Sequence, residues 1–257
     1  MIPKVIHYCW FGGNPLPKLA QKCLKSWKKY AKDYEIIEWN ESTYDLSTAP
    51  LYVRQAYEAK KWAFVTDYVR LQVVYEHGGI YMDTDVELKK RLDPLLVHKA
   101  YFGFEDSAHI NTGLGFGAEK GTPILKELMD DYAHIPFLKA DGTPDLTPCP
   151  ARNTQVFLRY GLKQDDSEQV LDDGIYILPS AKLCPMDYYM QLREGYKDAY
   201  SIHWFSGSWY SEKEREAVEK WRAELRKDRL IHTPNRMMIK LLGQNCYDKL
   251  KRLLGKG

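Results

Sequence analysis

Apolar positions along the first 90 residues switch between short continuous runs and stripes with the period of a helix. Val5 to Trp10 is an apolar run broken only by His7, which is typical of a strand buried in a parallel sheet. Residues 17–31 and 62–77 instead carry apolar side chains every three or four positions, the spacing of an amphipathic helix. Strands that alternate with helices in this way predict an α/β fold built on a mainly parallel sheet.

The same pattern predicts the remaining elements and two domains. We expect further strands over 34–39, 80–88, 100–105, 112–118, 174–178 and 199–205, and further helices over 50–60, 122–133, 152–161, 211–228 and 235–254. Four prolines between residues 136 and 150 predict a loop. We therefore expect an α/β domain over residues 1–210 and a basic, amphipathic helical extension over residues 211–257.

Charge is unevenly distributed, although the formal net charge of the chain is only +2. Residues 220–257 hold eleven Lys and Arg against three Asp and Glu, so the rest of the chain is net acidic. A basic segment of this kind is expected to contact an anionic membrane peripherally; a solvated helical pair that caps the domain is the alternative. No zinc-finger or other nucleic-acid-binding pattern accompanies it, so we expect no nucleic-acid partner.

Composition and cysteine usage favour a globular protein of the cytoplasm. The 257 residues are 44% hydrophobic and 28% charged, and they contain no apolar run long enough to cross a membrane. The first residues lack the pattern of a signal peptide. The five scattered cysteines include no Cys-x-x-Cys pair, which argues against a zinc or disulfide framework. We expect a cytoplasmic protein, at the inner face of the membrane if the basic extension binds lipid.

Asp83-Thr84-Asp85 is the only Asp-x-Asp in the chain, and it follows the apolar run Ile80-Tyr81-Met82. In a strand, residues two apart point to the same side, so the two carboxylates would repel each other. A divalent cation relieves that repulsion, because hard cations prefer oxygen ligands. Two solvated acids at the end of a strand are the alternative. The motif alone leaves both interpretations open.

Residues elsewhere in the chain suit the binding of sugar hydroxyls or a nucleotide base. Asp67 and Arg70 share one face of the 62–77 helix and offer an acceptor and a fork of donors for sugar hydroxyls; a surface ion pair is the alternative. Trp10 ends the first strand before Gly12-Gly13, where it would stack on a nucleotide base, or simply fill the core.

Polar residues near the later strands are further candidates. His203 opens the segment His203-Trp204-Phe205-Ser206-Gly207-Ser208-Trp209, which combines polar groups with aromatic walls, and His203 is a candidate third metal ligand. Asn111 and Asn153 are candidates for binding hydroxyls; turn and helix-capping roles are their alternatives.

Taken in order, these segments resemble the Asp-x-Asp sugar-binding glycosyltransferases of family 32, which include bacterial capsule and lipopolysaccharide transferases and yeast initiating mannosyltransferases. The glucosylating domains of large clostridial toxins are more distantly similar. The resemblance runs over about 200 residues, through 2–13, Ala63-Phe64-Val65-Thr66-Asp67-Tyr68-Val69-Arg70 and Gly78-Gly79-Ile80-Tyr81-Met82-Asp83-Thr84-Asp85, to His203 and Ser208-Trp209.

The resemblance implies a GT-A fold, a nucleotide-sugar donor, a Mn²⁺ or Mg²⁺ cofactor and transfer that retains the anomeric configuration. It implies the following site: Trp10 stacks on the base; Asp67 and Arg70 contact the donor sugar; Asp83 touches ribose and sugar; Asp85 binds the metal; His203, Ser208 and Trp209 close over the diphosphate. Asp85, Arg70 and Trp209 are then the catalytic candidates. In the toxins the position near His203 resembles an acid, so the third ligand is open.

We expect a retaining glycosyltransferase that moves a UDP-linked hexose or N-acetylhexosamine onto a glycan acceptor, lipid-linked if the basic extension binds membrane, in surface polysaccharide synthesis. Attack from the leaving-group face is the expected route, because no acid is marked by its position as a nucleophile. Two alternatives stay open. The Asp83 segment is also similar to the nucleophile motif of haloacid-dehalogenase-type phosphatases, with Asp165-Asp166 and Asp172-Asp173 as later acids. A non-catalytic carbohydrate-binding protein is the other.

Overall fold

The structure is a computed structural model that describes residues 1–187, 193, 195–207, 213 and 216–225. The chain divides into two compact units, Met1–Trp209 and Tyr210–Gly257. In the second unit the structure describes a helical stretch over 216–225, and the predicted helix over 235–254 lies outside the described residues. The basic extension and its membrane contact therefore stay predictions.

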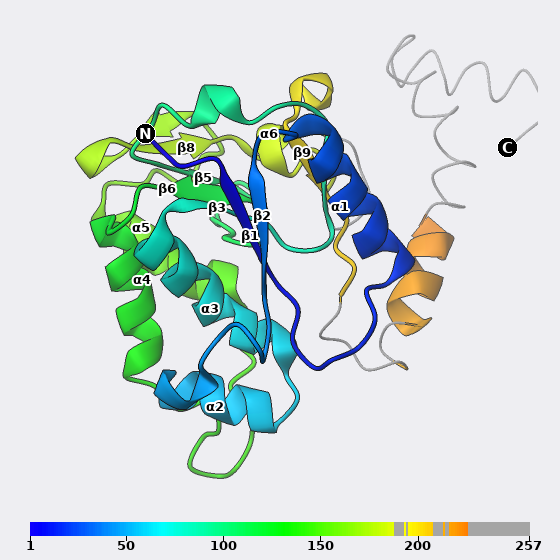
Figure 1. The fold of residues 1–257 in the computed structure, drawn as a ribbon, viewed down its shortest axis with the longest axis vertical. Coiled ribbons are helices and arrows are strands. Elements are labelled where there is room, and N and C mark those ends of the chain that lie inside the picture. Colours follow the sequence, from blue (N-terminus) through cyan, green and yellow to red (C-terminus); the bar gives the residue numbers. More distant parts are fainter. Residues whose placement is uncertain (188–192, 194, 208–212, 214–215, 226–257) are drawn as a thin grey trace, which may run out of the picture. The chain divides into compact units, whose positions relative to one another are not determined.

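The first unit is built on a mixed, seven-stranded sheet (Figure 1). In spatial order its strands are β2 (Glu35–Trp39), β1 (Val5–Cys9), β3 (Gly79–Tyr81), β6 (Phe116–Ala118), β5 (Ala100–Gly103), β8 (Ile175–Leu178) and β7 (Gln169–Val170). β1 is parallel to both of its neighbours, and β6 is antiparallel to both β3 and β5. A separate antiparallel pair joins β4 (Val86–Leu88) to β9 (Ser201–His203).

Helices cover both faces of the sheet (Figure 1). One face packs against α2 (Leu51–Glu58), α3 (Trp62–His77), α4 (Pro123–Ala133) and α5 (Cys149–Arg159), which share a core cluster with the inward side chains of the strands. The other face shares a second cluster with α1 (Lys18–Tyr30), β4 and the short α6 (Ser180–Leu183). The predicted α/β fold is confirmed, and its helices on both faces match the GT-A arrangement that the resemblance implied.

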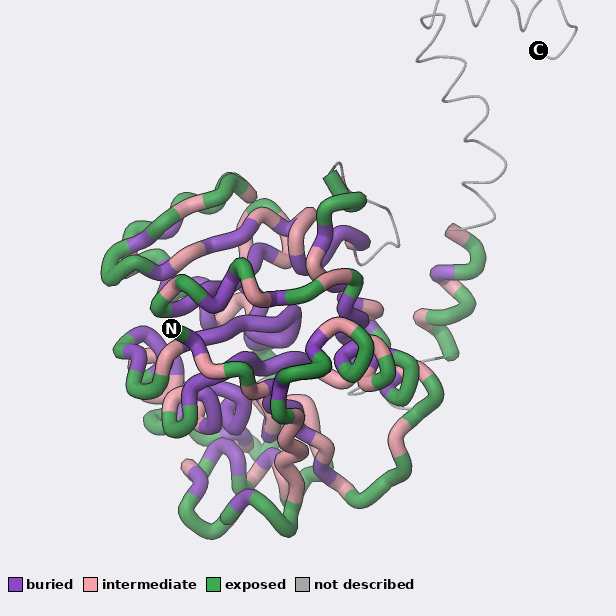
Figure 2. The backbone as a smooth tube through the Cα atoms, turned by 45° about the horizontal axis from the view of Figure 1, so that its top comes forward, coloured by how far each residue is buried: buried purple, intermediate pink, exposed green. Residues whose placement is uncertain are grey.

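Alternation along the strands explains why the sheet can be buried on both faces. In β3, Ile80 belongs to the cluster beneath α1, whereas Tyr81 belongs to the cluster beneath α3. Successive side chains of a strand point to opposite faces, so a strand covered on both sides must be apolar throughout. Figure 2 shows the result: the buried backbone runs through the central strands and the exposed backbone lies in the outer turns.

The predicted strand over 80–88 is wrong, and the error concerns the Asp-x-Asp motif itself. β3 ends at Tyr81 and belongs to the large sheet, whereas β4 starts at Val86 and belongs to the small one. Residues 82–85 lie between them, and the amide of Val86 donates to the carbonyl of Asp83 at 3.0 Å, which closes a turn. Asp83 and Asp85 therefore lie close together because the chain turns between two sheets. They are not neighbouring side chains on one side of a single strand, as the sequence suggested.

The predicted strand over 112–118 is shorter than expected, since only Phe116–Ala118 pair as β6.

No helix among the described residues is long and apolar enough to cross a membrane.

Candidate metal and donor-sugar site

The polar candidates collect where several strands end at one edge of the large sheet. β1 and β3 are parallel neighbours, so Trp10 and Asp83, which follow their carboxyl ends, lie at the same edge. β3 and β5 both run antiparallel to β6, so β5 ends at this edge too, and Glu105 follows it. Ligands of open α/β sheets bind beyond the carboxyl ends of strands.

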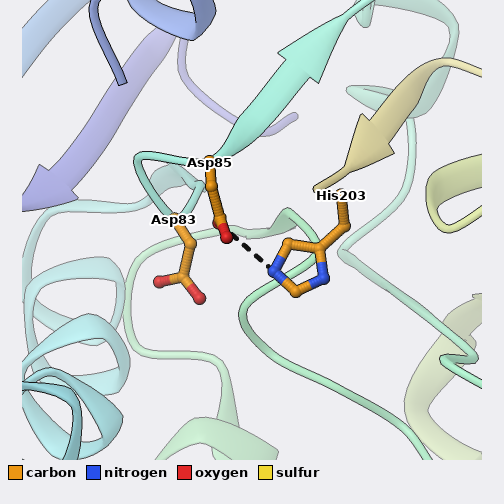
Figure 3. A group of neighbouring side chains, drawn as sticks. All are labelled: Asp83, Asp85 and His203. Atoms are coloured by element: carbon orange, nitrogen blue, oxygen red, sulfur yellow. Dashed lines mark ion pairs between the residues drawn. The ribbon is translucent and has the colours of Figure 1, made fainter. Parts of the chain in front are cut away.

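Asp83, Asp85 and His203 form one cluster, although His203 is far away in sequence (Figure 3). Each offers one ligand atom, and these atoms all lie within 4.8 Å of one another. The β4–β9 pairing places His203 opposite Val86, next to Asp85, and His203 Nε2 lies 3.2 Å from Asp85 Oδ1. The two carboxylates are ligands that suit Mn²⁺ or Mg²⁺, and the imidazole is a ligand that Mn²⁺ tolerates.

The two aspartates of the motif differ in their electrostatic surroundings. Burial raises the pKa of Asp85, but the charge and hydrogen bond of His203 and the backbone amide of Ser206, at 2.8 Å, reverse this and hold the pKa well below its usual range. Burial also raises the pKa of Asp83, and Asp85 adds to that increase while Arg70 opposes it. Asp85 is therefore the carboxylate that stays ionised most readily.

Asp67 and Arg70 meet Asp83 from the other side. Arg70 Nη2 lies 3.1 Å from Asp67 Oδ1 and 3.3 Å from Asp83 Oδ1, so one guanidinium joins α3 to the Asp-x-Asp turn. Its Nε donates to the carbonyl of Thr66 at 3.0 Å, and Tyr81 Oη donates to Asp83 Oδ1 at 2.8 Å. Arg70 is only 3% exposed, so the alternative of a surface ion pair is wrong.

Burial raises the pKa of Asp67 to about 6, with Arg70 partly opposing the increase. The Asp67 carboxyl is consequently within reach of protonation at mildly acidic pH, whereas Asp85 is not. The Arg70 guanidinium thus contacts both Asp67, whose carboxyl is easily protonated, and Asp83 in the Asp-x-Asp turn.

A second layer of residues, which sequence reasoning missed, surrounds Asn111. Its Nδ2 donates to Glu105 Oε2, and its Oδ1 accepts from the amide of Gly113 at 2.6 Å. A Cβ on Gly113 would stand 2.2 Å from Asp83 Oδ2, so only glycine lets the backbone approach the motif so closely. The sequence holds no signal for Glu105, because its contact with Asn111 depends on the path of the loop between β5 and β6.

Four other predicted residues make other contacts or lie outside what is described. Asn153 is 1% exposed, and its amide is engaged internally, donating to Thr112 Oγ1 at 3.1 Å and accepting from Tyr132 Oη at 3.4 Å. Trp10 is half-buried, and its Nε1 donates to the carbonyl of Asn14 at 2.5 Å. Ser208 and Trp209 lie outside the described residues. The donor-binding roles of these four stay predictions.

Comparison with known proteins bears on this geometry. Residues 17–102 match the family model described as "Glycosyltransferase sugar-binding region containing DXD motif". The match covers about a third of the chain, so the chain carries a region similar to that family. The region includes Asp67, Arg70, Asp83 and Asp85, so the predicted family is confirmed for the part of the chain that carries the motif.

Curated relatives carry glycosyltransferase names. Two are inositol phosphoceramide mannosyltransferases 3 and 1 of Schizosaccharomyces pombe, 29% identical over 53% and 68% of this chain. This chain spans only 38% and 57% of their lengths. An uncharacterized glycosyltransferase of Acanthamoeba polyphaga mimivirus is 28% identical over 81% of this chain and 84% of its own.

Among solved structures, the PaToxG glycosyltransferase aligns with a TM-score of 0.46 at 19% identity, over 62% of this chain and 68% of that one. The DXD glycosyltransferase region ends before Asn111, Asn153 and His203, so what is known of these residues comes from their contacts alone.

Proposed function

We propose that this chain is a metal-dependent, retaining glycosyltransferase that moves a hexose or N-acetylhexosamine from a UDP-sugar to a glycan acceptor. The observation that carries the proposal is the junction of two clusters: Asp83 belongs both to the Asp83–Asp85–His203 group and to the Arg70 ion pairs. One turn thus joins a place for a cation to a buried pair, Asp67 and Arg70, that is suited to a sugar.

The donor set fits a divalent cation. Asp83, Asp85 and His203 would hold Mn²⁺ or Mg²⁺, and Asp85 is the firmest ligand because its carboxylate is the most readily ionised. A cation bound there would act as a Lewis acid on the nucleoside diphosphate that leaves. The amide of Ser206 keeps the Asp85 carboxylate oriented toward the cluster.

The remaining side chains would bind and orient the donor. Asp67 accepts from sugar hydroxyls, Arg70 places donors where charge develops, and Trp10 stacks on the base. Glu105 holds the amide of Asn111 in one orientation, so that it can meet a sugar hydroxyl. Ser208 and Trp209 would close over the diphosphate.

Transfer is proposed to occur by attack from the leaving-group face. The bond between the anomeric carbon and the phosphate oxygen breaks with its electron pair on the diphosphate, the acceptor oxygen bonds to that carbon, and the diphosphate takes the acceptor proton. The Asp83 carboxylate is already engaged by Arg70 and Tyr81, which disfavours its use as a covalent nucleophile. Isolation of a glycosyl-enzyme adduct would contradict this route.

The contacts of the later acids weaken the phosphatase alternative. Asp165 and Asp166, its candidate later acids, are engaged elsewhere: Asp165 accepts from Ser167, and Asp166 accepts from the amide of Ser180 at 2.6 Å at the start of α6.

A mannosyl donor is the stronger competitor, because the names of the fission-yeast relatives specify mannose and a lipid-borne acceptor. A lipid-linked acceptor in surface polysaccharide synthesis remains part of the proposal.

A panel of UDP- and GDP-sugars with Mn²⁺ tests the proposal, with thermal stabilisation and donor hydrolysis as readouts. We expect one UDP-hexose or UDP-N-acetylhexosamine to stabilise the protein only with metal, and to release UDP. Asp85→Asn should abolish both effects, a loss of at least about a thousandfold in turnover. Release of inorganic phosphate would favour the phosphatase, and stabilisation without any hydrolysis or transfer would favour a binding protein.

A further inference from the structure

α1 carries a row of lysines along the face opposite the core. The helix buries Ala20, Cys23 and Trp27, and Trp27 belongs to the core cluster on this face of the sheet. On the outer face stand the exposed side chains of Lys18, Lys22, Lys25 and Lys29, spaced four, three and four residues apart. Side chains at these spacings share one face of a helix, so the lysine row (Lys18, Lys22, Lys25 and Lys29) extends about 17 Å.

Three of the four lysines in the row form no ion pair with the described residues. Elsewhere, Lys4 pairs with Asp33 and Asp93, and Lys126 pairs with Asp130. α1 contains no acidic residue, and within the described part of the chain only Lys22 of the row forms an ion pair, with Glu87 at 2.7 Å. Unpaired like charges in a row repel one another, so an external polyanion would stabilise them.

Lys22, the second lysine of the row, adjoins the candidate site. Lys22 Nζ lies 4.6 Å from the ring centroid of Trp204, and the Trp204 Nε1 donates to Glu87 Oε2 at 3.0 Å. Trp204 directly follows His203, and Glu87 lies two residues after Asp85. A surface that binds the row is therefore brought close to the proposed metal ligands.

We propose that the lysine row of α1 docks on the anionic headgroups of a membrane and thereby holds the site against the surface from which a lipid-linked acceptor is taken. The purpose of the contact rests on the proposed function, but the binding itself does not. A straight row of point charges matches a flat anionic surface. It lacks the arginine forks that read phosphates and bases in nucleic acids, so a membrane is the favoured partner.

Vesicle co-sedimentation tests the proposal, with phosphatidylcholine vesicles that contain or lack about 30% phosphatidylserine. The test variant neutralises Lys18, Lys25 and Lys29 to Gln and keeps Lys22, which is paired with Glu87. The control removes the same charge elsewhere by changing the exposed Lys120, Lys139 and Lys163 to Gln. Each lysine near an anionic surface contributes about fivefold in affinity, so we expect the test variant to lose about a hundredfold and the control to change little.

Two measurements keep the outcomes separate. Stabilisation by the UDP-sugar with Mn²⁺ should be the same in both variants, so a failure of that assay concerns the proposed function and not the membrane contact. Unchanged vesicle binding in the test variant would overturn the proposal, as would an equal loss in the control. A truncation at residue 229 is a further arm: if it alone removes binding, the basic extension and not α1 is the membrane contact.

Discussion

Two buried histidines of this chain have opposite surroundings, and the comparison shows what makes such a residue available to a ligand. His7 in β1 is 0% exposed, and both ring nitrogens are engaged by neutral groups: Nε2 lies 2.9 Å from the carbonyl of Gly78, and Nδ1 accepts from Trp39 Nε1 at 3.1 Å. His203 in β9 is 4% exposed, but its Nε2 faces the Asp85 carboxylate, and its Nδ1 forms no hydrogen bond with the described residues.

The partners set the charge of each ring. Burial lowers the pKa of His7 to about 4, only partly opposed by its hydrogen bond to Gly78, so this ring is neutral at physiological pH. Burial acts on His203 in the same direction, but Asp85 overrides it and raises the His203 pKa well above its usual value. Burial alone therefore does not identify a site residue. His7 has no free position for a ligand, whereas His203 faces a second ligand group.

Exchange of each histidine for glutamine is the strongest test of this contrast. His203→Gln should weaken Mn²⁺ binding by at least about a hundredfold, because it removes a ligand nitrogen. His7→Gln should leave Mn²⁺ affinity unchanged and lower the free energy of unfolding by about 2–4 kcal/mol, because buried groups lose their partners. Calorimetric Mn²⁺ titration and urea unfolding measure the two effects. Equal losses of Mn²⁺ affinity would break the comparison.

The pH dependence of stability sharpens the contrast. The pKa of His7 is lower in the folded state than the usual 6.5, so protonation favours the unfolded chain. Its contribution is complete above pH 6.5 and is lost as the pH falls toward 4, by up to about 3 kcal/mol. The pKa of His203 is raised, so its contribution in the metal-free protein is present below pH 6.5 and is lost at higher pH. Urea unfolding in EDTA between pH 4.5 and 8 measures both.

The His7→Gln variant is the control for that titration. It should remove the acid-dependent part of the wild-type curve and leave the rest unchanged. If the wild-type and variant curves run parallel between pH 4.5 and 6.5, the buried neutral state assigned to His7 is incorrect.

Trp39→Phe gives the smallest expected effect. The substitution keeps an aromatic ring but removes the donor to His7 Nδ1, so it should cost about 1–2 kcal/mol of unfolding free energy. Mn²⁺ affinity should be unchanged, because Trp39 lies beside His7 and away from the Asp83–Asp85–His203 cluster. Phe11→Leu, a change in the same core that removes no hydrogen bond, controls for lost packing. A shift in Mn²⁺ affinity in Trp39→Phe would link the two histidines.

Local sequence signals predicted much of the first half of the fold. The period of apolar residues over 62–77 and the glycine after it predicted α3 with the bounds that the structure has, because both signals are local, although the helix is buried on most of its sides. The three-residue spacing of Asp67 and Arg70 predicted that they share a face, and the structure pairs them at 3.1 Å. The short elements were harder: the 80–88 segment looked like one strand, because its apolar run continues across the turn.

By itself, the sequence determined the alternation of strands and helices, the DXD region and the candidate residues along it, since each depends on neighbours within a few positions. Only the tertiary structure decided that Asp83 and Asp85 meet in a turn between two sheets, that His203 joins them through the β4–β9 pairing, and that Glu105 orients Asn111. It also separated His203 from His7. The Glu105–Asn111 contact depends on the path of the loop between β5 and β6. The other outcomes depend on strands that pair across more than a hundred residues and on the charges that burial brings together, and no local pattern encodes them.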